Sequence, residues 1–177
     1  QTPNRVLTMN IGFYAPLKSP DSAIPSGDRE VAKLLFSSLE SQGHKVKLVS
    51  RFKSREPKGL EEKQKQLKLQ GEQISKELIK MFSTRGNWCP DLWFTYHAFY
   101  KAPDLIGPNV STALKIPYIV AEASHAPKRA FGRWSLFHGE VEKTIAHADL
   151  IIGMNTNDHA AIKQIINDNT RYEELRP

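Results

Sequence analysis

The sequence predicts a single α/β domain built on a mostly parallel β-sheet with helices on both faces. Short apolar runs alternate with stretches of helical periodicity, and several of the runs are apolar throughout. Strands that are buried on both faces have continuous apolar sequences, whereas strands with one solvated face alternate apolar and polar residues. The 177 residues suffice for one domain with a sizeable core. The predicted architecture is therefore a Rossmann-like three-layer sandwich.

Each element expected in the first half of the chain has a local signal. Apolar residues recur every three or four positions after Asp28, and Gly43 then ends the helix. The polar stretch after Glu61 carries a narrow apolar stripe at the same spacing, although Gly71 weakens that helix locally. The expected elements are strands at 6–14 and 45–50 and helices at 28–42 and 61–82.

The second half continues the alternation. Pro103 suits the first turn of a helix, where its missing N–H needs no partner. Apolar residues spaced three or four apart between Trp134 and Ala148 mark one face of a further helix. The expected elements are strands at 92–96, 116–121 and 149–154 and helices at 103–114, 134–148 and 156–168. The polar tail is expected to be a linker or a cut end, which places the domain at 1–168 and the linker at 169–177.

The composition is that of a globular domain, with 40% hydrophobic and 25% charged residues. No apolar run approaches the roughly 20 residues of a membrane helix, and the N-terminus has no signal-peptide pattern. The single cysteine, Cys89, excludes an internal disulfide and a cysteine metal cluster. These features fit a reducing compartment, so we expect a cytoplasmic protein.

The net charge of +6 is concentrated in one stretch. Between Lys45 and Lys68 there are nine basic and three acidic residues, which accounts for the whole surplus. Such a stretch indicates either an anionic partner or a solvated surface, and nucleic acid is the least favoured partner because no aromatic residues interleave with the charges. The residues expected to meet an anionic partner are Arg51, Lys53, Arg55 and Lys58.

In open parallel sheets, ligands bind beyond the carboxyl ends of the strands. One such segment, "AIPSGDREVAKLLFSSLE", places Ser26 and Gly27 before a helix whose first amides and positive dipole end can hold a phosphate. It has neither the three glycines of a dinucleotide fingerprint nor the Gly-Lys-Ser/Thr of a Walker loop. The alternative is that Ser26 and Gly27 only turn and cap the helix.

Two other segments at the expected ligand edge carry functional groups. His97 follows the third strand, close to Lys101, and has either a structural or a catalytic role. The segment "AEASHAPKRAFGRW" offers a carboxylate, a hydroxyl, an imidazole and three cations, which favours binding of hydroxyls and phosphates over a solvated loop. One histidine beside one glutamate is too few ligands for a closed metal centre, so no metal site is predicted.

Three stretches, taken in their order and spacing, carry a family resemblance: "FYAPLKSPDSAIPSGDREVAKLLFSSLESQGHKVKLVSRF", "DLWFTYHAFYKAPDLIGPNVSTALKIPYIVAEASHAPKR" and "ADLIIGMNTND". Together they resemble the N-terminal half of the family 4 glycosyltransferases, the retaining nucleotide-sugar enzymes of the GT-B fold, and specifically a bacterial subgroup. The resemblance covers nearly the whole chain. It implies two Rossmann-like domains, of which the first holds the acceptor and the second most of the nucleotide sugar.

The resemblance also implies roles for particular residues. His97 is the expected catalytic residue beside the donor sugar, and the helix start at Ser26, Gly27 and Asp28 is expected to meet the donor phosphates, with serine where many members have glycine. The residues expected to bind the acceptor are Lys101, Glu122, Ser124, His125, Lys128 and Arg129. The family's second domain carries two glutamates separated by seven residues, which this sequence lacks. We therefore expect an isolated N-terminal domain, inactive alone, whose residues 169–177 lead toward a C-terminal donor-binding domain.

The expected reaction moves a sugar from a nucleoside diphosphate sugar to an acceptor hydroxyl of a bacterial glycan or glycolipid, with retention of configuration. The nucleotide sugar is a co-substrate, and no bound cofactor or metal is expected because helix amides and basic residues can stabilise the leaving diphosphate. A glycolipid acceptor would bring the protein to the inner face of the membrane. The alternatives are a non-catalytic module that binds a phosphorylated ligand or a partner, and a nucleotide-sugar epimerase.

Overall fold

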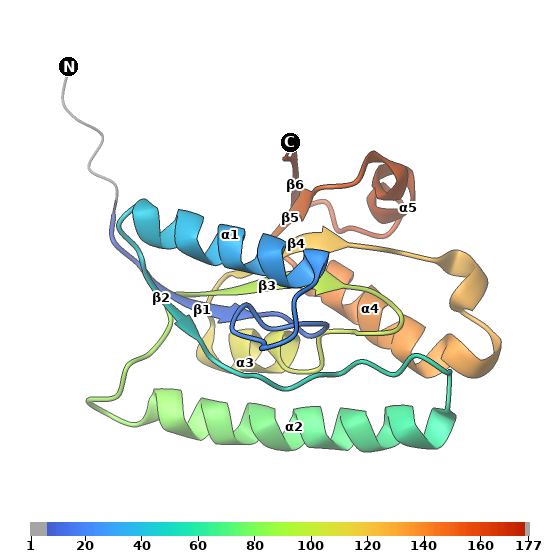
Figure 1. The fold of residues 1–177 in the computed structure, drawn as a ribbon, viewed down its shortest axis with the longest axis horizontal. Helices are drawn as coiled ribbons and strands as arrows, with labels where there is room; N and C mark the ends of the chain where they lie inside the picture. The colour runs from blue at the N-terminus through green and yellow to red at the C-terminus, as the bar shows by residue number, and fades with distance from the viewer. Residues whose placement is uncertain (1–6, 176–177) are drawn as a thin grey trace.

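The computed structural model describes residues 7–175 and confirms the Rossmann-like fold class (Figure 1). Six strands form one sheet in which every neighbouring pair is parallel, in the order β2-β1-β3-β4-β5-β6. The strands are β1 (Asn10–Tyr14), β2 (Lys45–Leu48), β3 (Leu92–Ala98), β4 (Tyr118–Ala123), β5 (Leu150–Gly153) and β6 (Arg171–Glu174).

The helices connect consecutive strands, as parallel pairing requires. They are α1 (Gly27–Ser41), α2 (Glu61–Ser83), α3 (Gly107–Leu114), α4 (Ser135–His147) and α5 (His159–Lys163), with 3₁₀ turns at Pro127–Arg129, Gly132–Trp134 and Thr156–Asp158. The apolar side of α1 packs on Phe13 and Phe94 at one face of the sheet. The opposite face, around Trp93 and Val120, is covered by α2, α3 and α4.

The strand order creates a switch point in the sheet. The chain leaves β1 through α1 to reach β2 on one side, and then returns through α2 to begin β3 on the other side of β1. The connections that follow β1 and β3 therefore diverge to opposite faces of the sheet. The loops beyond the carboxyl ends of these two strands stand where open α/β sheets bind their ligands.

Most expected elements are found with shifted ends. The helix expected from Pro103 begins instead at Gly107, and the next strand begins at Tyr118, after Lys115 has ended α3 with a left-handed φ of 55°. The helix expected at 156–168 is reduced to a 3₁₀ turn and α5. The first strand begins at Asn10, whereas Val6, expected to begin it, lies outside the described residues.

The clearest difference lies in the polar tail, where a linker was expected at 169–177. Residues Arg171–Glu174 form β6, whose backbone pairs in parallel with β5. Tyr172 supplies the apolar contact, because it packs against the core while its neighbours in the strand are exposed. A four-residue edge strand needs few apolar side chains, so its sequence resembles a loop.

A buried carboxylate ties β3, β4 and α3 together. Asp104 is 2% exposed, and its Oδ2 accepts hydrogen bonds from the hydroxyls of Thr95 (2.5 Å) and Tyr118 (2.6 Å). Its Oδ1 accepts from the backbone amides of Ile106 (2.9 Å) and Gly107 (2.7 Å) at the start of α3. Four donors therefore satisfy this carboxylate, as a buried charge requires.

Gly71 lets α2 approach the start of α3 closely. A methyl group at this position would lie 2.6 Å from Cβ and 2.8 Å from the carbonyl oxygen of Leu105. The glycine that weakens α2 by its helix propensity therefore permits the packing of α2 against α3.

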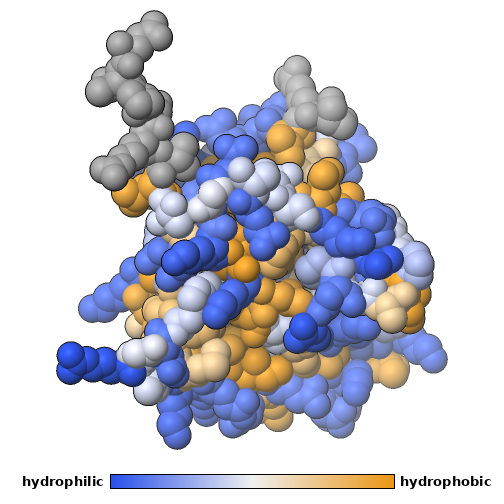
Figure 2. All heavy atoms as spheres, turned by 60° about the vertical axis from the view of Figure 1, so that its left-hand side comes forward, coloured by the Kyte–Doolittle hydropathy of each residue, from blue (hydrophilic) through white to orange (hydrophobic). Residues whose placement is uncertain are grey.

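Hydrophilic residues cover much of the side of the molecule in Figure 2, with hydrophobic residues gathered toward its middle. Within residues 7–175, no helix combines the length and the apolar character needed to cross a bilayer. Cys89, half-buried, is a free cysteine.

Replacing the Asp104 carboxylate with an amide should destabilise the fold. In Asp104→Asn, the NH₂ group cannot accept a hydrogen bond, so at least one buried donor loses its partner. We expect the free energy of unfolding to fall by about 2 kcal/mol in a urea titration. The matched control, Asp168→Asn, changes an exposed aspartate and should leave the unfolding midpoint unchanged. Equal midpoints for both variants would contradict the role of Asp104.

Gly71→Ala should also destabilise the protein, although alanine is the better helix former. The gain in helix propensity is about 1 kcal/mol, and overpacking against Leu105 costs about 1–3 kcal/mol. Gly139→Ala in α4 is the control, since a methyl group there meets nothing within 4 Å. We expect thermal unfolding to show a lower midpoint for Gly71→Ala and an equal or higher one for Gly139→Ala. The opposite order would contradict close packing at Gly71.

Candidate functional site

Two residues with strained backbones mark the carboxyl end of the sheet. His97 on β3 and Glu122 on β4 have φ values of 61° and 59°, in the left-handed region that favours glycine. They lie level with each other, because the pairs Tyr96–Ala121 and Ala98–Ala123 flank them in the strand register. Such strain costs about 1–3 kcal/mol per residue and clusters at functional sites.

The start of α1 meets His97 across the switch point. Nδ1 of His97 lies 2.8 Å from the carboxylate of Asp28, so the carboxylate can accept a hydrogen bond from the Nδ1–H group and leave Nε2 for a ligand. The His97 ring stacks on Phe99 with their centroids 4.9 Å apart. Segments that are 69 residues apart in the sequence thus converge at the edge indicated by the strand order.

The α1 terminus is both capped and open. Ser26 caps the helix, its hydroxyl accepting from the amide of Arg29 (3.2 Å) and its carbonyl from that of Glu30 (3.1 Å). Ser26 thus caps the helix, as one of the two expectations for this segment had it. Within residues 7–175 no hydrogen bond is found for the amides of Gly27 and Asp28, and Gly27 is exposed, with nothing within 4 Å of the position of a Cβ. These amides can bind a ligand.

Tyr96 links Glu122 to the helix start. Its side chain is 2% exposed, and burial together with the carboxylates of Glu122 and Asp28 raises its pKa, so the phenol stays protonated. Asp28, Tyr96, His97 and Glu122 thus form one group at the switch point, which we call the rim cluster. It contains two carboxylates, one imidazole and one phenol.

The residues expected to bind an acceptor separate into different environments. Lys101 and Arg129 converge on the ring of Tyr100, with Nζ 5.8 Å and Cζ 5.0 Å from its centroid. We call them the cation pair. Ser124 donates to Asp158 (3.0 Å), whereas Lys128 is exposed. The cation pair is therefore the group most suited to an anionic or hydroxyl-rich ligand.

His125 occupies a different place from the one its sequence position suggested. It is 9% exposed, and its Nε2 lies 3.0 Å from Oε1 of Glu142 on α4. Nδ1 of His138, one turn before Glu142, lies 3.8 Å from the same oxygen. Burial lowers the pKa of His138, although Glu142 opposes this, so the imidazole is neutral at pH 7. Because it is buried, we do not include His125 among the acceptor contacts.

Sequence reasoning did not anticipate this grouping. His138 and Glu142 are four residues apart, a spacing that places two side chains on one face of a helix, but His125 joins them only through the fold. The only local signal of this group in the sequence is therefore the spacing of four residues between His138 and Glu142.

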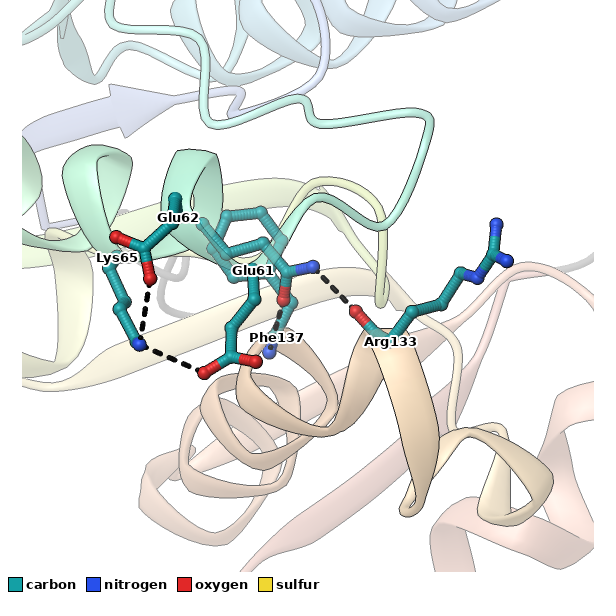
Figure 3. A network of polar contacts seen from close by, with 6 residues as sticks. Glu61, Glu62, Lys65, Arg133 and Phe137 are labelled. Atoms are coloured by element: carbon teal, nitrogen blue, oxygen red, sulfur yellow. Dashed lines mark hydrogen bonds and ion pairs between the residues drawn. The ribbon is translucent and has the colours of Figure 1, made fainter.

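The loop from β4 to α4 is anchored by Gln64, a buried residue of α2. Its amide nitrogen donates to the carbonyl of Arg133 (2.7 Å), and its amide oxygen accepts from the backbone of Phe137 (3.2 Å). Figure 3 shows these two bonds reaching from α2 to the turn before α4 and to the first turn of α4, beside the exposed ion pairs of Lys65 with Glu61 and Glu62. This anchor fixes the end of the loop that carries the second member of the cation pair.

The predicted anionic-partner residues lie in the loop between β2 and α2. Arg51, Lys53, Arg55 and Lys58 are all exposed. The residues between them fix the loop, since Ser54 donates to the carbonyl of Pro103 (2.6 Å) and the buried Glu56 accepts from the amides of Lys58 (3.0 Å) and Leu60 (2.9 Å). Arg51 pairs with Asp21 at 2.6 Å, and hydrogen bonds from Ser19 and Arg51 lower the pKa of this carboxyl.

Arg51 and Lys53 also line a hollow of about 350 Å³ with the loop of residues 19–24. The exposed side chain of Ile24 contributes an apolar wall to this hollow. The loop that carries Arg51 and Lys53 therefore borders this hollow, in which Asp21 neutralises the charge of Arg51.

Comparison with known proteins adds no family assignment, since no protein-family model and no curated protein matches the chain.

The left-handed backbone at Glu122 predicts an unusual order of stability between two variants. Glu122→Gly and Glu122→Ala both remove the carboxylate, but only glycine adopts this φ without strain. We expect Glu122→Gly to be more stable than Glu122→Ala by about 1 kcal/mol in a urea titration.

Glu173 on β6 is the matched control, because its φ is not in the left-handed region and its side chain is exposed. There, alanine should be at least as stable as glycine, which weakens ordinary strands. If Glu122→Ala equalled or exceeded Glu122→Gly, the strain at this position would be ruled out.

Proposed function

We propose that this chain is the N-terminal, acceptor-side domain of a retaining GT-B glycosyltransferase. The reaction transfers a sugar from a nucleoside diphosphate to an acceptor hydroxyl of a bacterial glycan or glycolipid. The observation that carries the proposal is the meeting of the exposed α1 terminus with His97 at the switch point. The family resemblance implies that these two segments share one donor site. In the structure, the side chains of Asp28 and His97 lie within hydrogen-bonding distance.

The chemistry of the rim cluster suits a neutral sugar beside a diphosphate. The amides of Gly27 and Asp28, with the positive end of α1, can bind a phosphate oxygen as negative charge builds on the leaving group. Nε2 of His97 can accept a hydrogen bond from a sugar hydroxyl, because Asp28 holds Nδ1. The bond from the anomeric carbon to the diphosphate breaks, a bond to the acceptor oxygen forms, and the acceptor proton leaves with the diphosphate.

The acceptor side is assigned to the cation pair and Glu122. Tyr100 offers an aromatic surface beside Lys101 and Arg129, and aromatic rings with nearby charged groups suit a sugar ring with an anionic substituent. The exposed row of Arg51, Lys53 and Arg55 attracts an anionic acceptor or the headgroups of a membrane at short range, since salt screens charges beyond about 10 Å. The proposed location is the cytoplasm, at the inner face of the membrane for a glycolipid acceptor.

Two variants of the natural full-length protein test this proposal. The protein is incubated with a panel of nucleoside diphosphate sugars, with and without acceptor, and release of nucleoside diphosphate is measured. We expect release to require acceptor. His97→Ala should lower kcat about 100-fold through misplacement of the donor sugar, with little change in the unfolding midpoint. Gly27→Ala should raise KM for the donor, because the added methyl group occupies space open to the phosphate.

Gly139→Ala is the control for Gly27→Ala. Its added methyl group also meets open space, but it lies on α4, away from the donor site. It should leave both kinetic constants unchanged. Conversion of a nucleotide sugar without acceptor would instead indicate an epimerase. An unchanged rate in both His97→Ala and Gly27→Ala would reject the donor site.

A further inference from the structure

His138 is a buried histidine of α4, and its Nε2 has no hydrogen-bond partner among the described residues. The side chain is 3% exposed, Nδ1 is 3.8 Å from the nearest carboxylate oxygen, and Nε2 is buried without a partner. The backbone of Ala126 lies within reach of the ring. Buried polar groups almost always have a hydrogen-bond partner, so the unpaired Nε2 of His138 indicates that a partner of this group is missing.

The surroundings of His138 supply what a metal ion needs. His125, His138 and Glu142 each present a ligand atom, and these atoms lie within 4.8 Å of one another. Both imidazoles are buried, with side chains 5% and 3% exposed, whereas the Glu142 side chain is 47% exposed. An ion could therefore reach the group from solvent past Glu142 while the two nitrogens remain enclosed.

The spacing of the donors matches a small tetrahedral ion. With bonds of about 2.0–2.1 Å, the donors of a tetrahedral Zn²⁺ site lie about 3.4 Å apart. The distances from Oε1 of Glu142 to Nε2 of His125 and to Nδ1 of His138 are 3.0 and 3.8 Å, on either side of this value. Two imidazoles and one carboxylate favour Zn²⁺ over Mg²⁺ or Ca²⁺, which prefer oxygen ligands.

We propose that His125, His138 and Glu142 bind a Zn²⁺ ion, with water as the fourth ligand. The ion fixes the β4–α4 loop to α4. His125 stands two residues after β4, and the other two ligands stand on α4, so the ion joins the two ends of this loop. Gln64 holds the same loop from the α2 side. The ion thus has a structural role and keeps the Arg129 of the cation pair in place, apart from the chemistry of the rim cluster.

The test is metal binding by the chain itself. The protein is freed of metal with EDTA and titrated with ZnCl₂ against a chromogenic chelator, and with CoCl₂ while its visible spectrum is recorded. We expect one Zn²⁺ per chain, a higher unfolding midpoint with Zn²⁺, and the intense visible bands of tetrahedral Co²⁺. Glu142→Gln and His138→Gln should each weaken binding at least about 100-fold, since even outer-shell partners change metal affinity about 10–100-fold.

His159→Gln is the matched control. His159 also pairs with a glutamate, with Nδ1 3.0 Å from Glu174, but it does not belong to the three-ligand group. Its Zn²⁺ affinity should equal that of the unmodified chain. Glu142→Gln alters an exposed side chain, and circular dichroism would verify that it folds. Absence of saturable Zn²⁺ binding, or binding unchanged in both ligand variants, would overturn the proposal.

Discussion

The connection from β3 to β4 at the carboxyl edge depends on the carboxylate of Asp104. It joins the hydroxyls of two adjacent strands to the first amides of α3, in the interior of the domain where no water competes. The connection between β3 and β4 must therefore fold back on the sheet directly after Ala98, the last residue of β3. Lys101 lies within this short return, which fixes its position relative to His97 and Tyr100.

Similar anchors hold the neighbouring loops. Glu56 binds the amides at the start of α2 and thereby sets the basic loop, while Gln64 binds both sides of the turn before α4. The cation pair and the basic residues between Arg51 and Lys58 stand on connections that are each fastened by a buried polar residue, whereas the rim cluster stands on α1, β3 and β4. This arrangement supplies the preorganisation that binding sites need while leaving their own side chains exposed.

The sequence predicted the layered α/β architecture because apolar runs and helical stripes are local signals, and β1 to β5 carry them strongly. The sequence did not predict β6. This strand forms because its backbone pairs with β5 and because Tyr172 packs against the core. The sequence also placed the start of α3 too early, because the buried Asp104 rather than Pro103 determines where that helix begins.

For the site, the rule that ligands bind beyond the carboxyl ends of parallel strands indicated the segments that carry Asp28 and His97, and these two residues do meet. The environment of His125 was not predictable, since it depends on two residues of α4 that lie more than a helical turn beyond the loop. The left-handed backbones of His97 and Glu122 left no mark in the sequence either, because neither position is a glycine. Tertiary contacts determine all three.

The two outer strands of the sheet carry charged side chains. A parallel sheet with free edges exposes backbone groups that could pair with another chain and begin aggregation. Here β2 carries Lys45 and Lys47, and β6 carries Arg171, Glu173 and Glu174. Two lysine-bearing strands would repel each other, and each charged side chain would have to lose hydration on pairing. Charged side chains on both edge strands therefore disfavour pairing between the sheets of two copies.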